Sequence, residues 1–475
     1  MNNKYYNYHC HNHKGNIKAL DVIVKQEDYC KRALELEHDA FFTTCHGMQG
    51  DIFEATTLAH EYDLKMIVGA ECYYVPNRFE KDKSNRHIII IALNREGIME
   101  LNDIISESNI TGMYYKPRID DELLFSLTPK NFVITTACVA GLWNNEDLIL
   151  RLKKHFGFNF YLEVQNHNVD IQKEVNKHVL ELSKKYNIRI IHANDSHYIY
   201  PQDAKNRDLF LKAKGIIYEE ENNFILDYPD YDEIINRYEI QGVLNKNQIK
   251  EALESTLVFE NIDCSDYLND DIKLPSIYDK PNQALKKILN DKWNDIKDEG
   301  PIADRPRYLE AIRYEMDIVE KTNMANYFLI DYNITKIAKE KYNGVLTKSG
   351  RGSAPSFYIT KLLDLTNIDR IAAPITLFPT RFMSVERILG TRSLPDIDLN
   401  SADAEPFIKA SKDLLGEENC EWMISWKPLQ ASSGFRLYCK AIGLGINEYN
   451  DVAKDLDKYK DDAKWGKIIE DSKPC

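Results

Sequence analysis

The sequence predicts an α/β fold made of two regions with different chemistry. Short apolar runs alternate with helical stretches through the first 200 or so residues. All twelve histidines lie between His9 and His197, and none follows. Two aspartates, Asp396 and Asp398, alternate along a short apolar stretch near residue 400. These observations predict a histidine-bearing barrel of strands and helices, followed by a mixed region that carries a carboxylate pair.

Strands and helices alternate along the first region. Apolar runs predict strands at residues 40–44, 66–69, 88–93, 132–135, 158–164 and 188–192. Periodic stretches predict helices at residues 26–36, 52–62 and 171–186. Such alternation is typical of a parallel sheet or a βα barrel.

Residue types that bind metals stand at the ends of these strands. His9 and His11 are expected on one face of an N-terminal strand, because side chains two apart share a face. Further candidates follow the later strands: His46, Glu71, Cys138, Asp195 and His197. Barrel enzymes keep their catalytic groups at the C-terminal rim of the strands. His87 is the exception, since it starts its strand.

A single histidine at such a place is more often a hydrogen-bonded core residue than a ligand. Eight candidates at one rim are hard to explain in that way. Imidazole, carboxylate and one thiol together suit Zn²⁺, Mn²⁺ or Fe²⁺ better than Mg²⁺.

The stretch that follows the first region carries no evident chemistry. Residues 201–278 are helical, acidic and aromatic, and residues 244–259 predict an amphipathic helix. Residues 279–282 predict a linker, followed by helices from Ala284 and over residues 308–321. We therefore place the first domain at 1–278 and a second at 279–430, with a third segment at 431–475.

A phosphate-binding loop is predicted at Gly350, Arg351, Gly352 and Ser353, before a helix over residues 356–363. Glycines let backbone approach a ligand closely, and helix N-terminal amides attract phosphate. Arginine and serine add further donors. Such a run is usually only a turn when it stands alone.

The stretch Pro395–Asn400 predicts a short strand with Asp396 and Asp398 on one face and Ile397 and Leu399 on the other. Paired carboxylates repel unless a cation lies between them, and Mg²⁺ suits such oxygen ligands. An isolated pair is more often an exposed strand end. Together with the phosphate loop, however, the pair suggests two-metal nucleotidyl transfer.

The bulk composition limits the possible function. The net charge of −14 argues against a protein that coats DNA generally, although seven basic and three acidic residues lie between Gly344 and Leu394. No apolar run approaches the ~18 residues of a membrane helix. Nine scattered cysteines and an N-terminus without an apolar signal predict a cytoplasmic protein.

The order of motifs in the second region resembles the palm of C-family DNA polymerases, the bacterial and phage DNA polymerase III alpha subunits. The series runs Asn326-Tyr-Phe-Leu-Ile, Gly350-Arg-Gly-Ser, Leu377-Phe, Arg381-Phe, Glu386-Arg and Ser393-Leu-Pro-Asp-Ile-Asp. The resemblance implies that Asp396 and Asp398 hold Mg²⁺ and that the loop binds an incoming dNTP opposite primed DNA.

The first region resembles the PHP (polymerase and histidinol phosphatase) domain, a distorted βα barrel that holds up to three metals. The resemblance implies the ligand set His9, His11, His46, Glu71, His87, Cys138, Asp195 and His197. Asp21 is the best candidate for a ninth ligand, with His13 or Asn16 as alternatives. A Zn²⁺- or Mn²⁺-dependent 3′–5′ exonuclease is therefore a hypothesis.

The family pattern becomes loose after Asn400, and residues 420–426 predict another strand. A thumb interrupts the palms of this family, and their third catalytic aspartate follows it; this chain ends where a thumb would begin. We therefore expect an incomplete palm and a second polypeptide that carries the rest. Two alternatives stay open: a metal-dependent phosphoesterase with a passive palm, or an assembly piece of a split phage polymerase without turnover.

Overall fold

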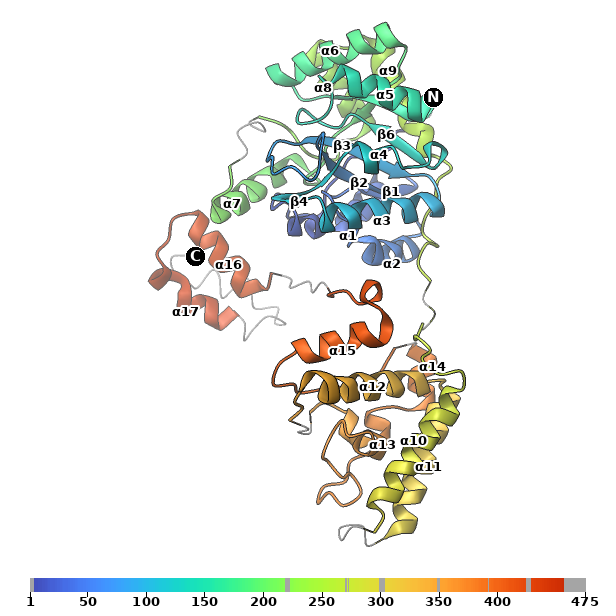
Figure 1. Cartoon of the computed structure of the whole chain (residues 1–475). Helices are drawn as coiled ribbons and strands as arrows, with labels where there is room; N and C mark the ends of the chain where they lie inside the picture. Colours follow the sequence, from blue (N-terminus) through green and yellow to red (C-terminus); the bar gives the residue numbers. More distant parts are fainter. Residues whose placement is uncertain are drawn as a thin grey trace. The chain divides into compact units, whose positions relative to one another are not determined.

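The computed structural model describes residues 4–217, 223–269, 271, 273–298, 304–347, 351–391, 393–423 and 429–456. It divides into two compact units (Figure 1). The first contains the described residues of Met1–Leu268 and of Pro428–Cys475, and the second those of Asn269–Lys427. No helix among the described residues has the length and apolar character needed to span a membrane.

The first unit is built on an eight-stranded sheet, which confirms the predicted α/β class. Its strands are β1 (Ala40–Thr43), β2 (Lys65–Tyr74), β3 (Arg86–Ala92), β4 (Met113–Tyr114), β5 (Lys116–Ile119), β6 (Phe132–Thr135), β7 (Phe160–Gln165) and β8 (Ile190–Ala193). The order across the sheet is β4-β5-β2-β3-β6-β7-β8, with β1 paired to β2.

The sequence had predicted a parallel sheet or a βα barrel. Strand β3 instead makes the sheet a mixed one. It runs antiparallel to β2, with Glu71 opposite Ile89, and antiparallel to β6, with Ile90 opposite Ile134. The pairs β1–β2, β2–β5, β6–β7 and β7–β8 are parallel. Isoleucines 88–91 are fully buried, so β3 lies in the centre of the core.

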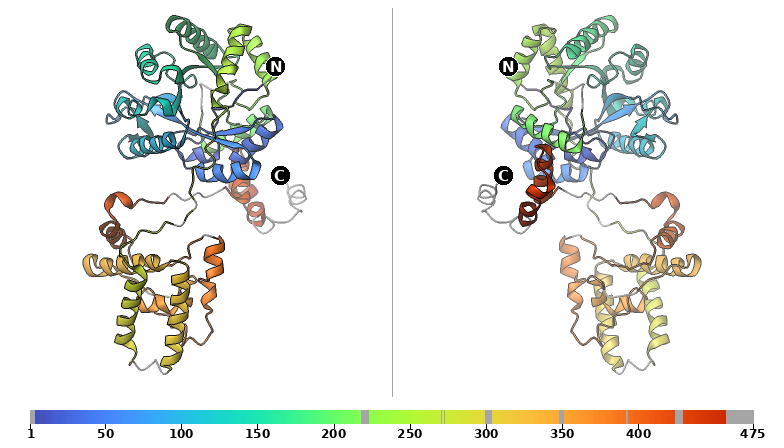
Figure 2. Two further views of the ribbon diagram at one scale, coloured as in Figure 1. Left: turned by 90° about the vertical axis from the view of Figure 1, so that its right-hand side faces the viewer. Right: turned by 90° about the vertical axis from the view of Figure 1, so that its left-hand side faces the viewer.

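Helices surround the sheet (Figure 2). They are α1 (Gln26–Glu35), α2 (Ile52–Tyr62), α3 (Arg95–Ile110), α4 (Asp121–Leu124), α5 (Glu146–Phe156), α6 (Asp170–Tyr186), α7 (Ala204–Lys214), α8 (Tyr231–Gln241) and α9 (Lys246–Ser255). Helix α9 is shorter than predicted, because a 3-10 turn at Thr256–Phe259 follows it. Two C-terminal helices, α16 (Ala431–Ala441) and α17 (Ile446–Leu456), belong to this unit, and α16 packs on α7.

Two strand predictions in the first unit need correction. Residues around His9 and His11 form no regular strand; Cys10 makes one isolated parallel bridge to Ser196. Strand β2 continues past Val68 to Tyr74, so Glu71 lies within the strand and not after it.

The second unit is helical in its described residues. Its helices are α10 (Pro281–Ile296), α11 (Arg305–Lys321), α12 (Ala325–Tyr342), α13 (Tyr358–Leu362), α14 (Val385–Thr391) and α15 (Glu405–Leu415). Aromatic side chains fill its core, among them Phe328, Phe357 and Phe382. Helix α12 packs against α10 and α15.

The strands predicted in the second unit are not formed among its described residues. Pro395–Asn400 is not assigned as a strand; the backbone N–H of Thr347 donates to the carbonyl of Asn400 at 2.9 Å, and an isolated bridge joins Leu346 and Ser401. The predicted alternation of faces is nevertheless present: Asp396 and Asp398 are exposed, whereas Ile397 and Leu399 pack on the core. Residues 420–423 form no strand, and residues 424–426 lie outside the described residues.

Candidate metal centre

The sheet brings the candidate ligands to one edge. His46 follows β1 and bridges to Glu71 of β2. Because β3 is antiparallel to its neighbours, its first residues lie at the edge where β2 and β6 end, and His87 stands directly opposite Tyr73. The antiparallel direction of β3 therefore explains why a histidine at the start of a strand joins ligands at the ends of others.

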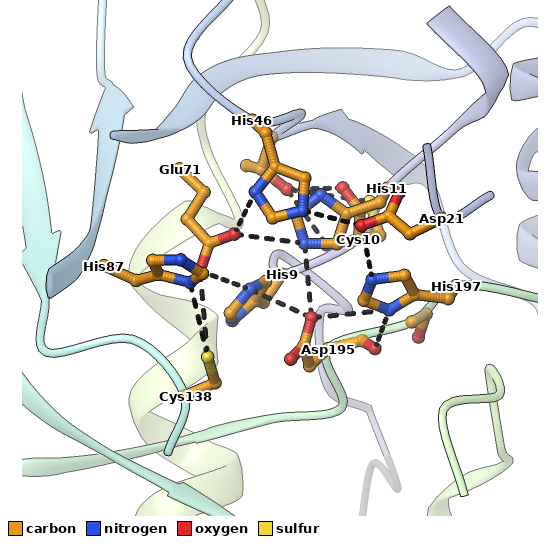
Figure 3. Close-up of polar contacts among 12 residues, drawn as sticks. His9, Cys10, His11, Asp21, His46, Glu71, His87, Cys138, Asp195 and His197 are labelled. Atoms are coloured by element: carbon orange, nitrogen blue, oxygen red, sulfur yellow. Dashed lines mark hydrogen bonds and ion pairs between the residues drawn. The ribbon is translucent and has the colours of Figure 1, made fainter. Parts of the chain in front are cut away.

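Glu71 is the centre of the cluster (Figure 3). Its carboxylate lies 2.7 Å from Nδ1 of His46 and 2.8 Å from Nδ1 of His87. Nε2 of His9 and Nε2 of His11 are each 3.5 Å from it. One buried carboxylate thus faces four imidazoles.

Two aspartates complete the polar shell. Oδ1 of Asp195 lies 3.2 Å from Nε2 of both His9 and His11, and 3.6 Å from Nδ1 of His197. Oδ2 of Asp21 lies 3.1 Å from Nε2 of His46 and 3.5 Å from Nε2 of His197. Three carboxylates therefore connect all five histidines of the cluster.

The structure distinguishes between Asp21, His13 and Asn16, the three candidates for the ninth ligand. The side-chain oxygen of Asn16 accepts hydrogen bonds from the backbone N–H groups of Asp21 and Val22, at 3.1 Å each, so Asn16 stabilises the loop that carries Asp21. Neither His13 nor Asp21 belongs to the groups of described residues whose ligand atoms all lie within 4.8 Å of one another, but Asp21 contacts His46 and His197. Asp21 alone of the three lies against cluster histidines.

Cys138 lies at the rim of the cluster, on the loop after β6. Its Sγ is 3.6 Å from Nδ1 of His87 and 3.9 Å from Oε1 of Glu71. Burial raises the pKa of the thiol well above its usual range, and the charges of Asp195 and Glu71 raise it further. A cation would be needed to hold this sulfur as a thiolate.

Opposed charges dominate the electrostatics of the cluster. Burial disfavours ionisation of Glu71, yet His87 and His46 hold its pKa well below the usual range. Burial also disfavours charge on His46, but Glu71 and Asp21 raise its pKa to about 10. Burial, reinforced by the charge of His46, lowers the pKa of His11 to about 3. Protons thus balance the carboxylates, and a metal ion would have to displace them.

The donor set fits metal ions. Three overlapping groups have ligand atoms within 4.8 Å of one another: His11, His46 and His197; His9, His11 and Glu71; and His46, Glu71 and His87. Buried atoms without a hydrogen bond include Nε2 of His9, both ring nitrogens of His11 and Oδ1 of Asp195. The two Nε2 atoms lie 3.2 Å from Oδ1 of Asp195 without hydrogen-bond geometry, and buried polar atoms of this kind are costly unless a ligand satisfies them. The mixture of nitrogen, oxygen and sulfur donors is suited to a transition metal.

Glu163 is a supporting residue that the sequence analysis missed. Its buried carboxylate on β7 lies 2.9 Å from Nδ1 of His9 and accepts hydrogen bonds from Tyr8 and Thr135. A carboxylate on one imidazole nitrogen directs the other nitrogen toward a metal. The available signal was a charged residue inside the apolar run Phe160-Tyr-Leu-Glu-Val.

A cavity of about 850 Å³ opens beside the cluster. Asp21, His46, Glu71, His87, Cys138, Asp195 and His197 are among its lining residues. His9 and His11 lie deeper and are fully buried. The cluster therefore faces a space large enough for a small ligand.

The candidate nucleotide site in the second unit forms a separate group. Nε of Arg351 lies 3.9 Å from Oδ1 of Asp398, and Arg351 donates to the side chain of Asn400 at 3.3 Å. Gly352 has φ +65° and faces the carboxylate of Asp398. Ser353 precedes a 3-10 turn at Ala354–Ser356. Gly350 lies outside the described residues.

One expectation for this loop is wrong. The helix after it is only five residues long, and the backbone N–H groups of Tyr358 and Ile359 both donate to the buried carboxylate of Glu315, at 2.9 Å. Arg370 pairs with the same carboxylate. These two amides are therefore not available to a phosphate, whereas Arg351 and Ser353 carry side-chain donors.

Comparisons with known proteins agree with this division. Residues 9–167 match the model of the PHP domain, and residues 281–474 match that of the bacterial DNA polymerase III alpha NTPase domain. A solved structure titled as a putative metal-dependent phosphoesterase from Bifidobacterium adolescentis aligns with 50% of this chain and 97% of its own, at 12% identity and a TM-score of 0.28.

Relatives match along nearly the whole chain. The DNA polymerase III subunit alpha of Aquifex aeolicus is 27% identical over 96% of this chain, and that of Borreliella burgdorferi 25% identical over 94%. The chain spans only 41% and 40% of the lengths of these relatives. The chain therefore matches the models of a PHP domain and of a bacterial DNA polymerase III alpha NTPase domain in succession, and it is similar to part of the DNA polymerase III alpha subunits.

Proposed function

We propose that the chain is part of a replicative DNA polymerase in which the histidine cluster is a working 3′–5′ exonuclease. The observation that carries the proposal is the convergence of the nine predicted ligands on one edge of the sheet, beside a cavity of about 850 Å³. A cluster kept only as scaffold would not need buried nitrogen and oxygen atoms without hydrogen bonds in its core.

The residues divide the work as follows. The histidines, Cys138 and the three carboxylates would hold Zn²⁺ or Mn²⁺, which supplies an activated water and neutralises charge on the phosphodiester. Glu71, which faces four imidazoles, would be shared between ions. Glu163 fixes the orientation of His9 through Nδ1, and the cavity admits the strand end.

A labelled single strand tests the exonuclease. The purified chain is incubated with a 5′-labelled oligonucleotide and Mn²⁺ or Zn²⁺, and shortening from the 3′ end is followed. We expect His9→Ala to abolish shortening, whereas His155→Ala, on α5 and in contact with Phe125, leaves it unchanged. Shortening that survives His9→Ala would disprove the assignment.

A second function, nucleotidyl transfer, has its own supporting observation. The exposed carboxylate of Asp398 lies against Gly352 and beside Arg351. Asp396 and Asp398 would hold Mg²⁺, and Arg351 and Ser353 would contact the phosphates of a dNTP opposite primed DNA. A second polypeptide with the remaining palm carboxylate would complete the site, in a bacterial or phage-infected cytoplasm.

Primer extension tests this second function and its alternatives. The chain, alone and with candidate partner polypeptides, is given a 5′-labelled primer on a template, Mg²⁺ and four dNTPs. We expect Asp396→Asn and Asp398→Asn to abolish extension by the complete assembly. If both variants extend normally, the palm is passive, and the chain is a phosphoesterase or an assembly piece.

A further inference from the structure

The lining of the cavity beside the histidine cluster contains two chemically different groups besides the candidate ligands. One group is the cations of Lys83, Arg86 and Lys116. The other is the rings of Trp143 and Phe224. Neither group belongs to the ligand set, so these residues are free to determine what the cavity binds.

Lys116 is the cation nearest to the cluster by its contacts. Its ammonium group lies 5.0 Å from the centre of the Tyr73 ring, and that ring stacks on His46 at 5.8 Å. The ammonium group also donates a hydrogen bond to the backbone carbonyl of Lys18, at 3.1 Å. Arg86 begins β3, one residue before His87, and is exposed. Both cations line the same cavity as the candidate ligands.

Each of the two aromatic residues contacts a neighbouring group. The indole N–H of Trp143 donates to the carbonyl of Val139 at 2.8 Å, and the ring meets His178 edge-on at 5.8 Å. Phe224 contacts the ring of His167 at 4.6 Å. Fixed aromatic rings beside a basic surface are how proteins bind unpaired nucleotides without sequence preference, because every base has a face to stack.

We propose that Trp143 and Phe224 receive the base of the terminal nucleotide, while Lys116 and Arg86 contact its phosphate. This proposal rests on the exonuclease function proposed above and assigns the residues that select its substrate. The ligand histidines 9, 11, 46 and 197 are buried, so a phosphate reaches them only by entering the cavity. A paired end would carry its complementary strand with it, and the terminal base must therefore leave the stack to enter.

Two substrates distinguish the role of the aromatic rings from the role of the cations. One is a 5′-labelled single strand, and the other is methyl p-nitrophenyl phosphate, a diester without a base. We expect Trp143→Ala to lower kcat/KM for the strand by about 5- to 100-fold, the range of one lost base–aromatic stack, and to leave the small diester unchanged. We expect Lys116→Met to lower kcat/KM for both substrates.

Matched variants exclude a general loss of structure. Trp143→Phe should retain most of the activity because it keeps an aromatic ring. Lys116→Arg should do so because it keeps the positive charge. Trp422→Ala and Lys81→Met, which alter exposed residues outside the cavity lining, should have no effect. Metal content per chain should be equal in all variants. An equal loss for both substrates in Trp143→Ala would overturn the base-binding role.

A third measurement keeps this inference separate from the exonuclease proposal. A strand that ends in photoreactive 4-thiothymidine is irradiated with the full chain in Mn²⁺, and the crosslinked peptide is identified by mass spectrometry. A crosslink at Trp143 or Phe224 supports the inference even if the chain hydrolyses nothing. A crosslink that avoids both residues overturns it, even if the chain is an active exonuclease.

Discussion

The carboxylate of Asp398 occupies the space where a side chain on residue 352 would begin. A β-carbon added to Gly352 would lie 1.8 Å from Oδ2 of Asp398. Gly352 also has φ +65°, a conformation that residues with side chains rarely adopt. The glycine of the loop and the aspartate of the pair are therefore fitted to each other, although 46 positions separate them.

Gly352→Ala should displace Asp398 and strain the loop. We expect a loss of about 1–2 kcal/mol in the free energy of unfolding of the second unit, from the left-handed φ and the steric conflict. The control is Gly390→Ala within α14, where an added β-carbon meets nothing within 4 Å. Urea unfolding measures both. A Gly352→Ala variant as stable as Gly390→Ala would contradict the observed fit.

Glu163→Gln should weaken metal binding without removing a ligand. The amide no longer accepts the His9 Nδ1 proton as a carboxylate does, so Nε2 is less well directed toward the cluster. We expect metal affinity to fall by about 10- to 100-fold. Competition with a chromogenic chelator measures it, with the exposed Glu174→Gln on α6 as control. Equal affinities would show that Glu163 only supports the core.

The choice of Asp21 over His13 can be tested by metal content. Asp21→Asn removes a carboxylate that lies 3.1 Å from His46, and we expect fewer ions per chain by elemental analysis. His13→Ala should leave the count unchanged. The reverse result would transfer the ninth position to His13.

The raised pKa of Asp331 leads us to expect that the stability of the second unit depends on pH. Burial raises the pKa of this half-buried carboxyl on α12 to about 7. The folded state therefore binds more protons than the unfolded state between about pH 4 and 7, and the free energy of unfolding falls as pH rises through that window.

Asp331→Asn should remove this penalty. We expect the variant to be about 1–2 kcal/mol more stable than the parent at pH 8, after discounting for partial exposure, and similar to it at pH 4. Urea unfolding at the two pH values measures the difference, and Asp295→Asn, on the exposed face of α10, is the control. A difference that is the same at both pH values would contradict the prediction.

Much of the candidate metal centre could be predicted from residue types and spacing. Ligand-type side chains next to apolar runs predicted a shared rim, and the structure brings His46, Glu71, His87, Asp195 and His197 together there. Alternation also predicted that Asp396 and Asp398 share an exposed face. These features depend on neighbours in the sequence, whose geometry the backbone period determines.

Only the tertiary structure decided the features that depend on distant segments. The antiparallel direction of β3 placed His87 at the rim, and Glu163 reached His9 across 154 positions. The carboxylate of Glu315 accepts hydrogen bonds from the backbone N–H groups of Tyr358 and Ile359, whereas the sequence had predicted that the amides of this helix bind phosphate. Local periodicity predicts which face of a strand or helix a side chain occupies. Strand direction and the partner of a buried charge depend on long-range packing, because each buried polar group requires a hydrogen-bond partner.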